Sequence, residues 1–338
     1  MNAIRLRYRF ALIITLTLCS ILAMSSLMQS ASAQQSNTGN GFRISPLVKQ
    51  IPARDSNIDS IDPGERTTFE INITNVTSDP LIAKAEFNDF LPRNESGSPS
   101  IIIDTTQENE FGLRTYFSPI EDFRLEPSED KTVEVTMDVP ANATPGGHFG
   151  IVRFTAIPVE GDETVTVSAS VGTIVLMNIS GEAEENLDLV EFTAGNVVGE
   201  DSYEAKSFFE TGPVSIFTRL QNSGNTFVAP FGSLKLKNTF GSEVQSYQLN
   251  DVFGNVLPDS IRRFETSLGD RFYLGRYTVE GTISYGGGGD IINVSDTFWV
   301  LPYKVIVPAV LGLAVIIFGG RILVTRYNDK IVAKSRRR

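Results

Sequence analysis

The sequence predicts an all-β fold: two immunoglobulin-like β-sandwich domains in tandem, followed by a single transmembrane helix. Three observations carry this prediction. Apolar and polar residues alternate over short stretches, clusters of Pro, Gly, Asn and Asp separate these stretches, and one long uncharged apolar segment stands near the C-terminus. Alternation with a period of two is typical of strands that bury one face. Many short strands with regular turn signals favour a sandwich.

The N-terminus has the pattern of a secretory signal peptide over residues 1–33. The first nine residues hold three arginines, and a mostly apolar run follows over residues 10–24. Ala31-Ser32-Ala33 then provides a small-x-small cleavage motif. The alternative is a retained membrane anchor, but the polar run "QQSNTGNG" after the motif favours cleavage.

The C-terminus predicts a membrane helix over residues 303–325 and a basic cytoplasmic tail over residues 326–338. Val305–Val324 is 20 residues long, and a helix of that length covers about 30 Å, the thickness of the hydrocarbon core of a bilayer. Basic residues are retained on the cytoplasmic side of a membrane. We therefore expect a single-pass protein of the cell membrane, with an extracellular N-terminal ectodomain and a cytoplasmic C-terminus.

Charge and cysteine content narrow the functional classes. Residues 34–303 carry 18 basic and 39 acidic side chains, a net charge of −21. Such a surface repels nucleic acids and anionic lipids, so no nucleic-acid partner is expected. The single cysteine, Cys19, lies in the signal peptide, which leaves the mature chain without disulfides or thiolate chemistry. That absence favours a bacterial surface protein.

The first predicted sandwich covers residues 41–182. Its strands are "TFEINIT", "LIAKAEF", "TVEVTMDV" and "TVTVSASV". The alternating apolar residues expected to face the core are Phe69, Ile71, Ile73, Leu81, Ala83, Ala85, Phe87, Val133, Val135, Met137, Val139, Val165, Val167, Ala169 and Val171.

The second predicted sandwich covers residues 183–302 and follows an acidic break, "GEAEENLDL". We expect "VSIFTRLQNSGNTFV" to form two strands around a turn at residues 222–225. "LKLKN", "RYTVEGTISY" and "INVSDTFWVL" are further strands, and four glycines at 286–289 form the tip of a hairpin. A weak internal repeat relates "FEINITNVTSDPLIAKAEF" to "SIFTRLQNSGNTFVAPFGSLKL": both have a strand, an Asn-centred turn and a strand.

The order of these pieces resembles the WxL-interacting proteins of Gram-positive surfaces. The resemblance rests on "IDPGERTTFEINITNVTSDPL", "FRLEPSEDKTVEVTMDVPANATPGGHFGIVRF", "FETGPVSIFTRLQNSGNTFVAPFGSLKLKN" and a closing "DTFWVLP" before the apolar segment. It implies a peptidoglycan-binding first domain and a partner-binding second domain. It places no binding residue on a numbered position, and "FGNVLPDS" departs from the family's pattern.

The stretch "PGGHFGIVRF" holds Gly146, Gly147 and the only histidine, His148. A phosphate loop would need a following helix, whereas a strand follows here. A catalytic histidine would need a partner nucleophile or acid, and no such motif is present. We interpret the stretch as a turn that leads into a strand, with no catalytic role.

Two other patterns have alternative interpretations. "DSNIDSID" places Asp55, Asn57 and Asp59 at calcium-loop spacing, but Ser60 and Arg66 stand where an EF-hand needs Gly and Glu. A polar turn is favoured over a looser calcium site. Six Asn-x-Ser/Thr sequons are interpreted as turn chemistry rather than glycosylation sites; they begin at Asn72, Asn75, Asn94, Asn142, Asn178 and Asn293.

The sequence therefore predicts a membrane-anchored, non-catalytic bacterial surface protein that contacts peptidoglycan, other surface proteins (WxL-type ones included), or both. No catalytic, cofactor-binding or metal-binding residue, no cofactor and no small-molecule substrate are expected. The first alternative is a scaffold or chaperone-like subunit of a surface export or assembly system, which would offer an unprotected edge strand bordered by basic residues to client strands. The second alternative is a cell-wall hydrolase with paired carboxylates.

Overall fold

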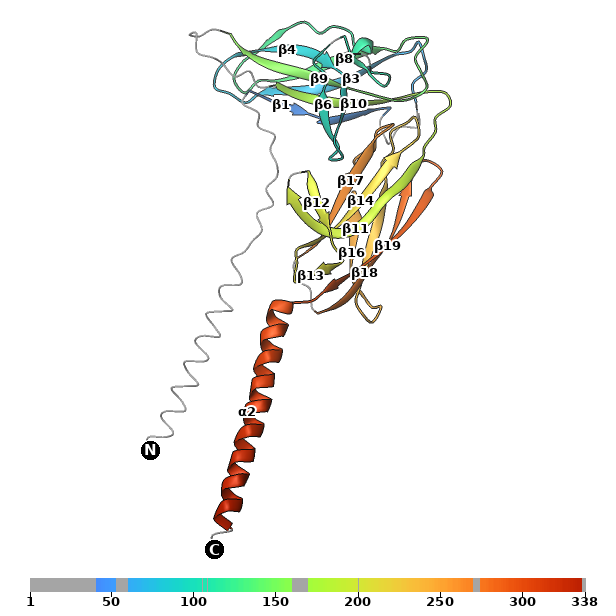
Figure 1. The fold of residues 1–338 in the computed structure, drawn as a ribbon. Helices are drawn as coiled ribbons and strands as arrows, with labels where there is room; N and C mark the ends of the chain where they lie inside the picture. Colours follow the sequence, from blue (N-terminus) through green and yellow to red (C-terminus); the bar gives the residue numbers. More distant parts are fainter. Residues whose placement is uncertain are drawn as a thin grey trace, which may run out of the picture. The chain divides into compact units, whose positions relative to one another are not determined.

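The computed structural model describes residues 41–52, 60–104, 106–107, 109–159, 170–199, 201–269 and 274–335. The predicted signal peptide, the carboxylates and amide of "DSNIDSID" at residues 55–59, and Val165, Val167 and Ala169 lie outside the described residues. The described residues are mostly β, with strands in two sandwiches and one apolar C-terminal helix (Figure 1). The predicted fold class is confirmed.

The first sandwich packs a sheet of three strands against a sheet of five. The smaller sheet has the order β1 (Phe42–Ser45), β3 (Arg66–Asn75), β8 (Asp130–Asp138). The larger has the order β2 (Val48–Ile51), β10 (Ser170–Ile179), β9 (Gly146–Pro158), β4 (Leu81–Asn88), β7 (Phe123–Leu125). A separate hairpin pairs β5 (Phe90–Arg93) with β6 (Ser98–Ile101), and a short 3₁₀ turn, η1, covers Arg114–Tyr116.

The second sandwich packs four strands against five. The smaller sheet has the order β12 (Ser202–Ala205), β11 (Leu187–Gly199), β14 (Val214–Asn222), β17 (Ile261–Gly269). The larger has the order β13 (Phe208–Phe209), β19 (Asp290–Val300), β18 (Gly275–Tyr285), β15 (Phe231–Lys237), β16 (Glu243–Leu249).

Side-chain alternation builds the first core as predicted. Phe69, Ile71 and Ile73 of β3 are buried against the facing sheet, and so are the four predicted residues Val133, Val135, Met137 and Val139. On β4 the pattern holds fully only for the first residues, because Ala85 and Phe87 are partly buried at the edge of the core. Apolar burial in these strands is the main term that stabilises the sandwich.

The internal repeat extends to hydrogen bonds. Asn75 ends β3 and Asn222 ends β14, and both side chains are fully buried. Each amide nitrogen donates to the carbonyl oxygen four residues on and to a second, distant carbonyl oxygen, at 2.7–3.2 Å. Each amide oxygen accepts the backbone N–H two residues on, at 3.0 and 2.9 Å. One asparagine thus satisfies the backbone of each turn, as buried polar groups require.

Both sandwiches also contain a short strand that runs parallel to the last strand of the larger sheet. β2 pairs with β10, and β13 pairs with β19; all other strand pairs are antiparallel among the named strands. In the first sandwich the chain crosses from one sheet to the other between β1 and β2. β1 therefore lies at the edge of the smaller sheet, and β2 lies at the edge of the larger sheet.

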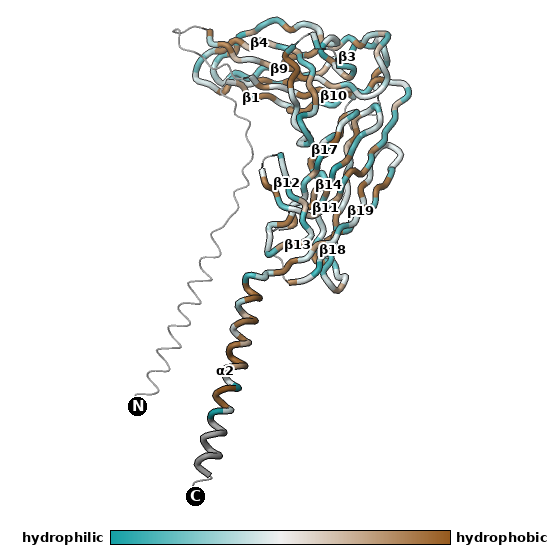
Figure 2. Tube along the Cα trace, in the orientation of Figure 1, coloured by the Kyte–Doolittle hydropathy of each residue, from teal (hydrophilic) through white to brown (hydrophobic). Residues whose placement is uncertain are grey.

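The structure differs from two sequence predictions. Residues 226–228 do not form a strand after the turn, and Val228 makes one isolated bridge, to Val256. The two apolar side chains of this segment pack in different places: Val228 joins the second core, and Phe227 joins the apolar cluster that it shares with the first sandwich. The C-terminal helix α2 covers Tyr303–Ser335 and so continues through most of the predicted tail. Its first 24 residues, Tyr303–Arg326, form a helix long and apolar enough to cross a membrane (Figure 2).

Candidate functional site

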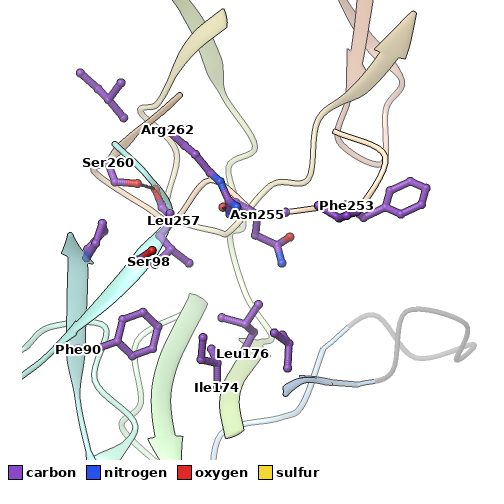
Figure 3. Close-up of a pocket in the computed structure, with 15 residues that line it drawn as sticks. Phe90, Ser98, Ile174, Leu176, Phe253, Asn255, Leu257, Ser260 and Arg262 are labelled. Carbon is purple, nitrogen blue, oxygen red and sulfur yellow. Dashed lines mark hydrogen bonds between the residues drawn. The ribbon is translucent and has the colours of Figure 1, made fainter. Parts of the chain in front are cut away.

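A groove of about 360 Å³ lies between the two sandwiches (Figure 3). The first sandwich supplies side chains from β2, β10 and the β5–β6 hairpin, namely Val48, Ile174, Leu176, Phe90, Pro92 and Ser98. The second supplies the loop after β16 and the start of β17, including Val252, Phe253, Asn255, Leu257, Ser260 and Arg262. The lining is mainly apolar, as is typical of binding grooves.

The floor of the groove exists because β10 is apolar on both faces. Val175 and Met177 point into the first core and are fully buried. Ile174 and Leu176 point the opposite way, as strand geometry requires. They belong to a third apolar cluster, which Phe227 and Leu257 of the second sandwich join. Figure 3 shows Ile174 and Leu176 on one side of the groove and Leu257 on the other.

The roof of the groove is the loop between β16 and β17, which contains the "FGNVLPDS" stretch. Asn250 organises it: its amide nitrogen donates to the carbonyl oxygens of Pro230 and Gly254 at 2.6 and 2.9 Å. Its amide oxygen accepts the Gly254 N–H at 2.7 Å. Beyond this anchor the loop exposes two large apolar side chains, Val252 and Phe253.

Among the residues that the structure describes, Arg262 is the one basic side chain that lines the groove. It is half-buried, and its Nη1 donates to the carbonyl oxygen of Asn255 at 2.7 Å, while its buried Nε has no hydrogen-bond partner. A methyl group added at Gly97 or Gly254 would occupy the present position of the guanidinium, so both glycines leave room for it. Within the described part of the chain Arg262 makes no ion pair, and burial lowers its pKa below the usual arginine value.

A cluster of polar side chains fixes the β5–β6 hairpin against the second sandwich. Arg219 of β14 binds both carboxylate oxygens of Glu95, with Nε to Oε2 at 2.7 Å. Its Nη1 donates to Glu191 at 3.1 Å, and the hydroxyl of Tyr203 donates to the same carboxylate at 2.6 Å. Burial, followed by the bond to Glu191, raises the pKa of Tyr203 to about 12.

The Gly146–Gly147 pair lies at a close contact between the backbones of the two sandwiches. The Gly147 N–H donates to the carbonyl oxygen of Asn225 at 2.8 Å. A methyl group at Gly146 would clash with that oxygen, and one at Gly147 would lie 2.8 Å from the backbone nitrogen of Phe227. β9 begins at Gly146, so these glycines are the first residues of the strand rather than a turn before it. Close backbone approach, as well as the positive φ of Gly146, requires them.

His148 lies in β9, and its side chain is buried and packed against aromatic rings. Its Nε2 donates to the carbonyl oxygen of Thr144 at 2.8 Å, and the rings of Phe111 and Tyr116 lie beside it. Its Nδ1 has no hydrogen-bond partner among the described residues. Burial lowers its pKa, against smaller raising effects of the Thr144 carbonyl and Glu110.

One edge of the larger sheet of the first sandwich, the strand β2, lies beside the groove. β2 pairs with β10 on one side, and no described strand lies on its other side. Leu47 and Val48 are about half exposed. The segment Phe42–Ile51 contains two basic residues, Arg43 and Lys49, and no acidic residue. This is the kind of edge strand that the scaffold alternative requires.

The remaining sequence candidates have structural roles or lie outside the described residues. The four glycines at 286–289 form the tip of the β18–β19 hairpin, where the Gly287 N–H donates to Glu185 at 2.6 Å. The suggested calcium ligands Asp55, Asn57 and Asp59 lie outside the described residues. Among the residues that the structure describes, no group of three His, Cys, Asp or Glu side chains could hold a metal ion.

The sequence matches no protein-family model and no curated protein. Among solved structures, the chain is similar to the class 5 fimbriae chaperone CfaA, with 12% identity, a TM-score of 0.37, and coverage of 77% of this chain and 100% of that one. It is also similar to the E. coli chaperone DraB, with 11% identity, a TM-score of 0.34, and coverage of 77% and 97%. The Pseudomonas aeruginosa CupB2 chaperone gives 13% identity, a TM-score of 0.31, and coverage of 75% and 96%. Likeness at this level transfers no residue role and no partner to this chain.

Proposed function

We propose that the protein is a membrane-anchored, non-catalytic scaffold of the cell surface that holds an extended segment of another surface protein. The segment would lie along β2 and place side chains in the neighbouring groove. The observation that carries this proposal is the free edge of β2 beside an apolar groove. The proposal favours the assembly scaffold over a protein whose main ligand is the cell wall.

Strand addition supplies both affinity and selectivity in this arrangement. An extended segment that joins a sheet edge gains backbone hydrogen bonds, and every second side chain enters the adjacent pocket. The carbonyl oxygen of Leu47 accepts the N–H of Ile174 and so points toward β10. Because successive backbone groups of a strand point to opposite sides, the N–H groups of Val48 and Gln50 point outward and are available to a partner.

The proposed membrane anchor is the C-terminal helix α2. The apolar part of α2 suits a single membrane crossing, and the basic residues after Val324 favour a cytoplasmic C-terminus. β19 ends at Val300, three residues before α2 begins, so the second sandwich would stand next to the bilayer. Peptidoglycan binding by the first domain stays a prediction of the family resemblance; retention of the purified chain on wall material would test it.

Site-specific photocrosslinking in the producing cell tests the proposal. A photoreactive residue at Val48, on the β2 edge, is compared with one at Val244 on β16, an exposed residue on the edge strand of the other sandwich. The proposal predicts a defined protein adduct at Val48 and none at Val244. The same adducts at both positions, or none at Val48, would contradict it.

A further inference from the structure

Arg262 and its neighbour Arg263 are both half-buried and make no ion pair in the described part of the chain, but only Arg262 lines the groove, and its Nε is buried without a hydrogen-bond partner. Other half-buried arginines have acid partners. Arg219 binds Glu95 and Glu191, and Arg153 binds Glu86. Arg262 has a carbonyl oxygen and an aromatic ring near it, with its guanidinium carbon 5.3 Å from the centre of the Phe264 ring. It has no carboxylate within ion-pair distance in the described part of the chain.

This arrangement costs stability, because the protein removes a charge from water without providing an opposite charge. The cost is notable in this chain, since residues 34–303 hold 39 acidic side chains against 18 basic ones. Two glycines, Gly97 and Gly254, make room for the guanidinium. A cation held in this way beside an apolar groove is suited to an anion that arrives with a ligand.

We propose that Arg262 receives a carboxylate of the bound segment, flanked by apolar residues of that segment. The inference rests on the proposed function and specifies what the groove selects. The planar guanidinium can bind a carboxylate through two parallel hydrogen bonds, which are strong in a partly dehydrated site. The floor of the groove, formed by Ile174 and Leu176, and Leu257 opposite it accept the neighbouring apolar side chains.

The carboxylate has two sources within a polypeptide. If the bound segment continues past the groove, the carboxylate belongs to an Asp or Glu side chain of that segment that points into the groove. Apolar residues two positions before and after it then point the same way. In a segment that ends in the groove, it is the C-terminal carboxylate. Val48 of β2 lines the same groove as Arg262, so a segment paired with β2 passes within reach of the groove in either case.

The test uses the full chain in detergent micelles and a synthetic library of random 12-residue peptides with free C-termini. Enriched peptides are sequenced and remade with each carboxylate replaced by its amide. Affinities are measured for the wild type, Arg262→Met and Arg262→Lys. The matched control is Arg263→Met, the next residue of β17, which does not line the groove and donates to the carbonyl oxygen of Asp201.

The expected result is enrichment of peptides in which one carboxylate stands among apolar residues. Its amide should bind the wild type about tenfold to a hundredfold more weakly, the range for hydrogen bonds to charged groups. Arg262→Met should bind acid and amide alike, Arg262→Lys should recover part of the preference, and Arg263→Met should keep it. If affinity falls when an internal Asp or Glu is replaced by its amide, the ligand is a side-chain carboxylate. If affinity falls when the C-terminus is amidated, the ligand is the end of the chain.

Equal binding of acid and amide by the wild type would overturn the inference even if Arg262→Met fails to fold. If such peptides still bind more weakly to Gln50→Pro, the proposed function stands although the inference about Arg262 fails. If no peptide is enriched by the wild type over Gln50→Pro, which removes an outward N–H of β2, the proposed function and the inference both fail.

Discussion

Arg219 of the second sandwich and Glu95 of the first form a two-bond ion pair, with Nε to Oε2 at 2.7 Å and Nη2 to Oε1. The backbone strengthens the link, because the N–H of Arg263 donates to the carbonyl oxygen of Glu95 at 2.8 Å. Both side chains are about three-quarters buried. This pair holds the β5–β6 hairpin, and with it one wall of the groove, against the second sandwich.

Glu95→Gln should therefore loosen the wall of the groove. The substitution removes a charged acceptor from a partly buried arginine, and we expect a loss of about 1–3 kcal/mol in the free energy of unfolding. Hydrogen exchange of the β5–β6 hairpin should become faster. The control is Glu126→Gln, whose pair with Arg124 is exposed on both sides and should contribute little. Equal effects of the two substitutions would contradict the role of this pair.

Asn75→Ala and Asn222→Ala should each destabilise the sandwich that contains the asparagine. Each change leaves buried backbone groups of a turn without partners, and we expect a cost of roughly 2–3 kcal/mol in thermal or denaturant unfolding. Asn72→Ala is the control, since this residue lies within β3 and bonds an exposed threonine hydroxyl, Thr132. A cost at Asn72 equal to that at Asn75 would show that the buried hydrogen bonds are not the cause.

The sequence predicts much of the scaffold because alternation and turn chemistry are local. Ile71, Val135 and Met137 are recognisable as core residues from their spacing alone. The Asn-centred repeat is likewise visible in the sequence, although the buried bonds of Asn75 and Asn222 become evident only in the structure.

The groove could not be predicted in the same way, because it depends on contacts between distant segments. The signal was present in "GTIVLMNI", which is apolar at successive positions rather than at every second one. Such a strand needs cover on both faces, and here the second face meets the neighbouring sandwich. Nothing local distinguishes Arg262 from an exposed basic residue, since its lack of an acid partner is a property of the folded surroundings.

Gly147→Ala should weaken the contact between the sandwiches. The new methyl group would lie 2.8 Å from the backbone nitrogen and from a ring carbon of Phe227, so the two sandwiches would have to separate slightly. We expect a loss of about 1–3 kcal/mol, typical of overpacking. Gly288→Ala, at a hairpin tip with no positive φ and no close neighbour, is the control. No difference between the two variants would argue against close approach at Gly147.

His148 should make stability depend on pH. Burial lowers its pKa in the folded state below 6.5, so the unfolded state binds the proton more readily. Its contribution is fully present above pH 6.5 and is lost as the pH falls from 6.5 through the lower folded pKa. Unfolding measured between pH 7.5 and 5 should show this loss in the wild type and a smaller loss in His148→Gln. A wild-type curve identical to that of the variant would contradict the assignment.

Arg262→Met should fold and should be no less stable than the wild type. Methionine keeps the length of the side chain and removes a charge that burial disfavours, so thermal unfolding should occur at the same or a higher temperature. Arg219→Met, which leaves Glu95 and Glu191 without their cation, should lower the unfolding temperature. If Arg262→Met were as destabilising as Arg219→Met, Arg262 would be part of the structural framework rather than a residue kept for a ligand.

The edge of β2 is the centre of this account, and a proline scan of two adjacent residues tests it most directly. Gln50→Pro removes an N–H that points away from β10, whereas Lys49→Pro removes one that points toward it. With a photoreactive residue at Val48, we predict that Gln50→Pro keeps the unfolding temperature of the parent chain and loses the protein adduct. An undiminished adduct in folded Gln50→Pro would contradict strand addition at this edge.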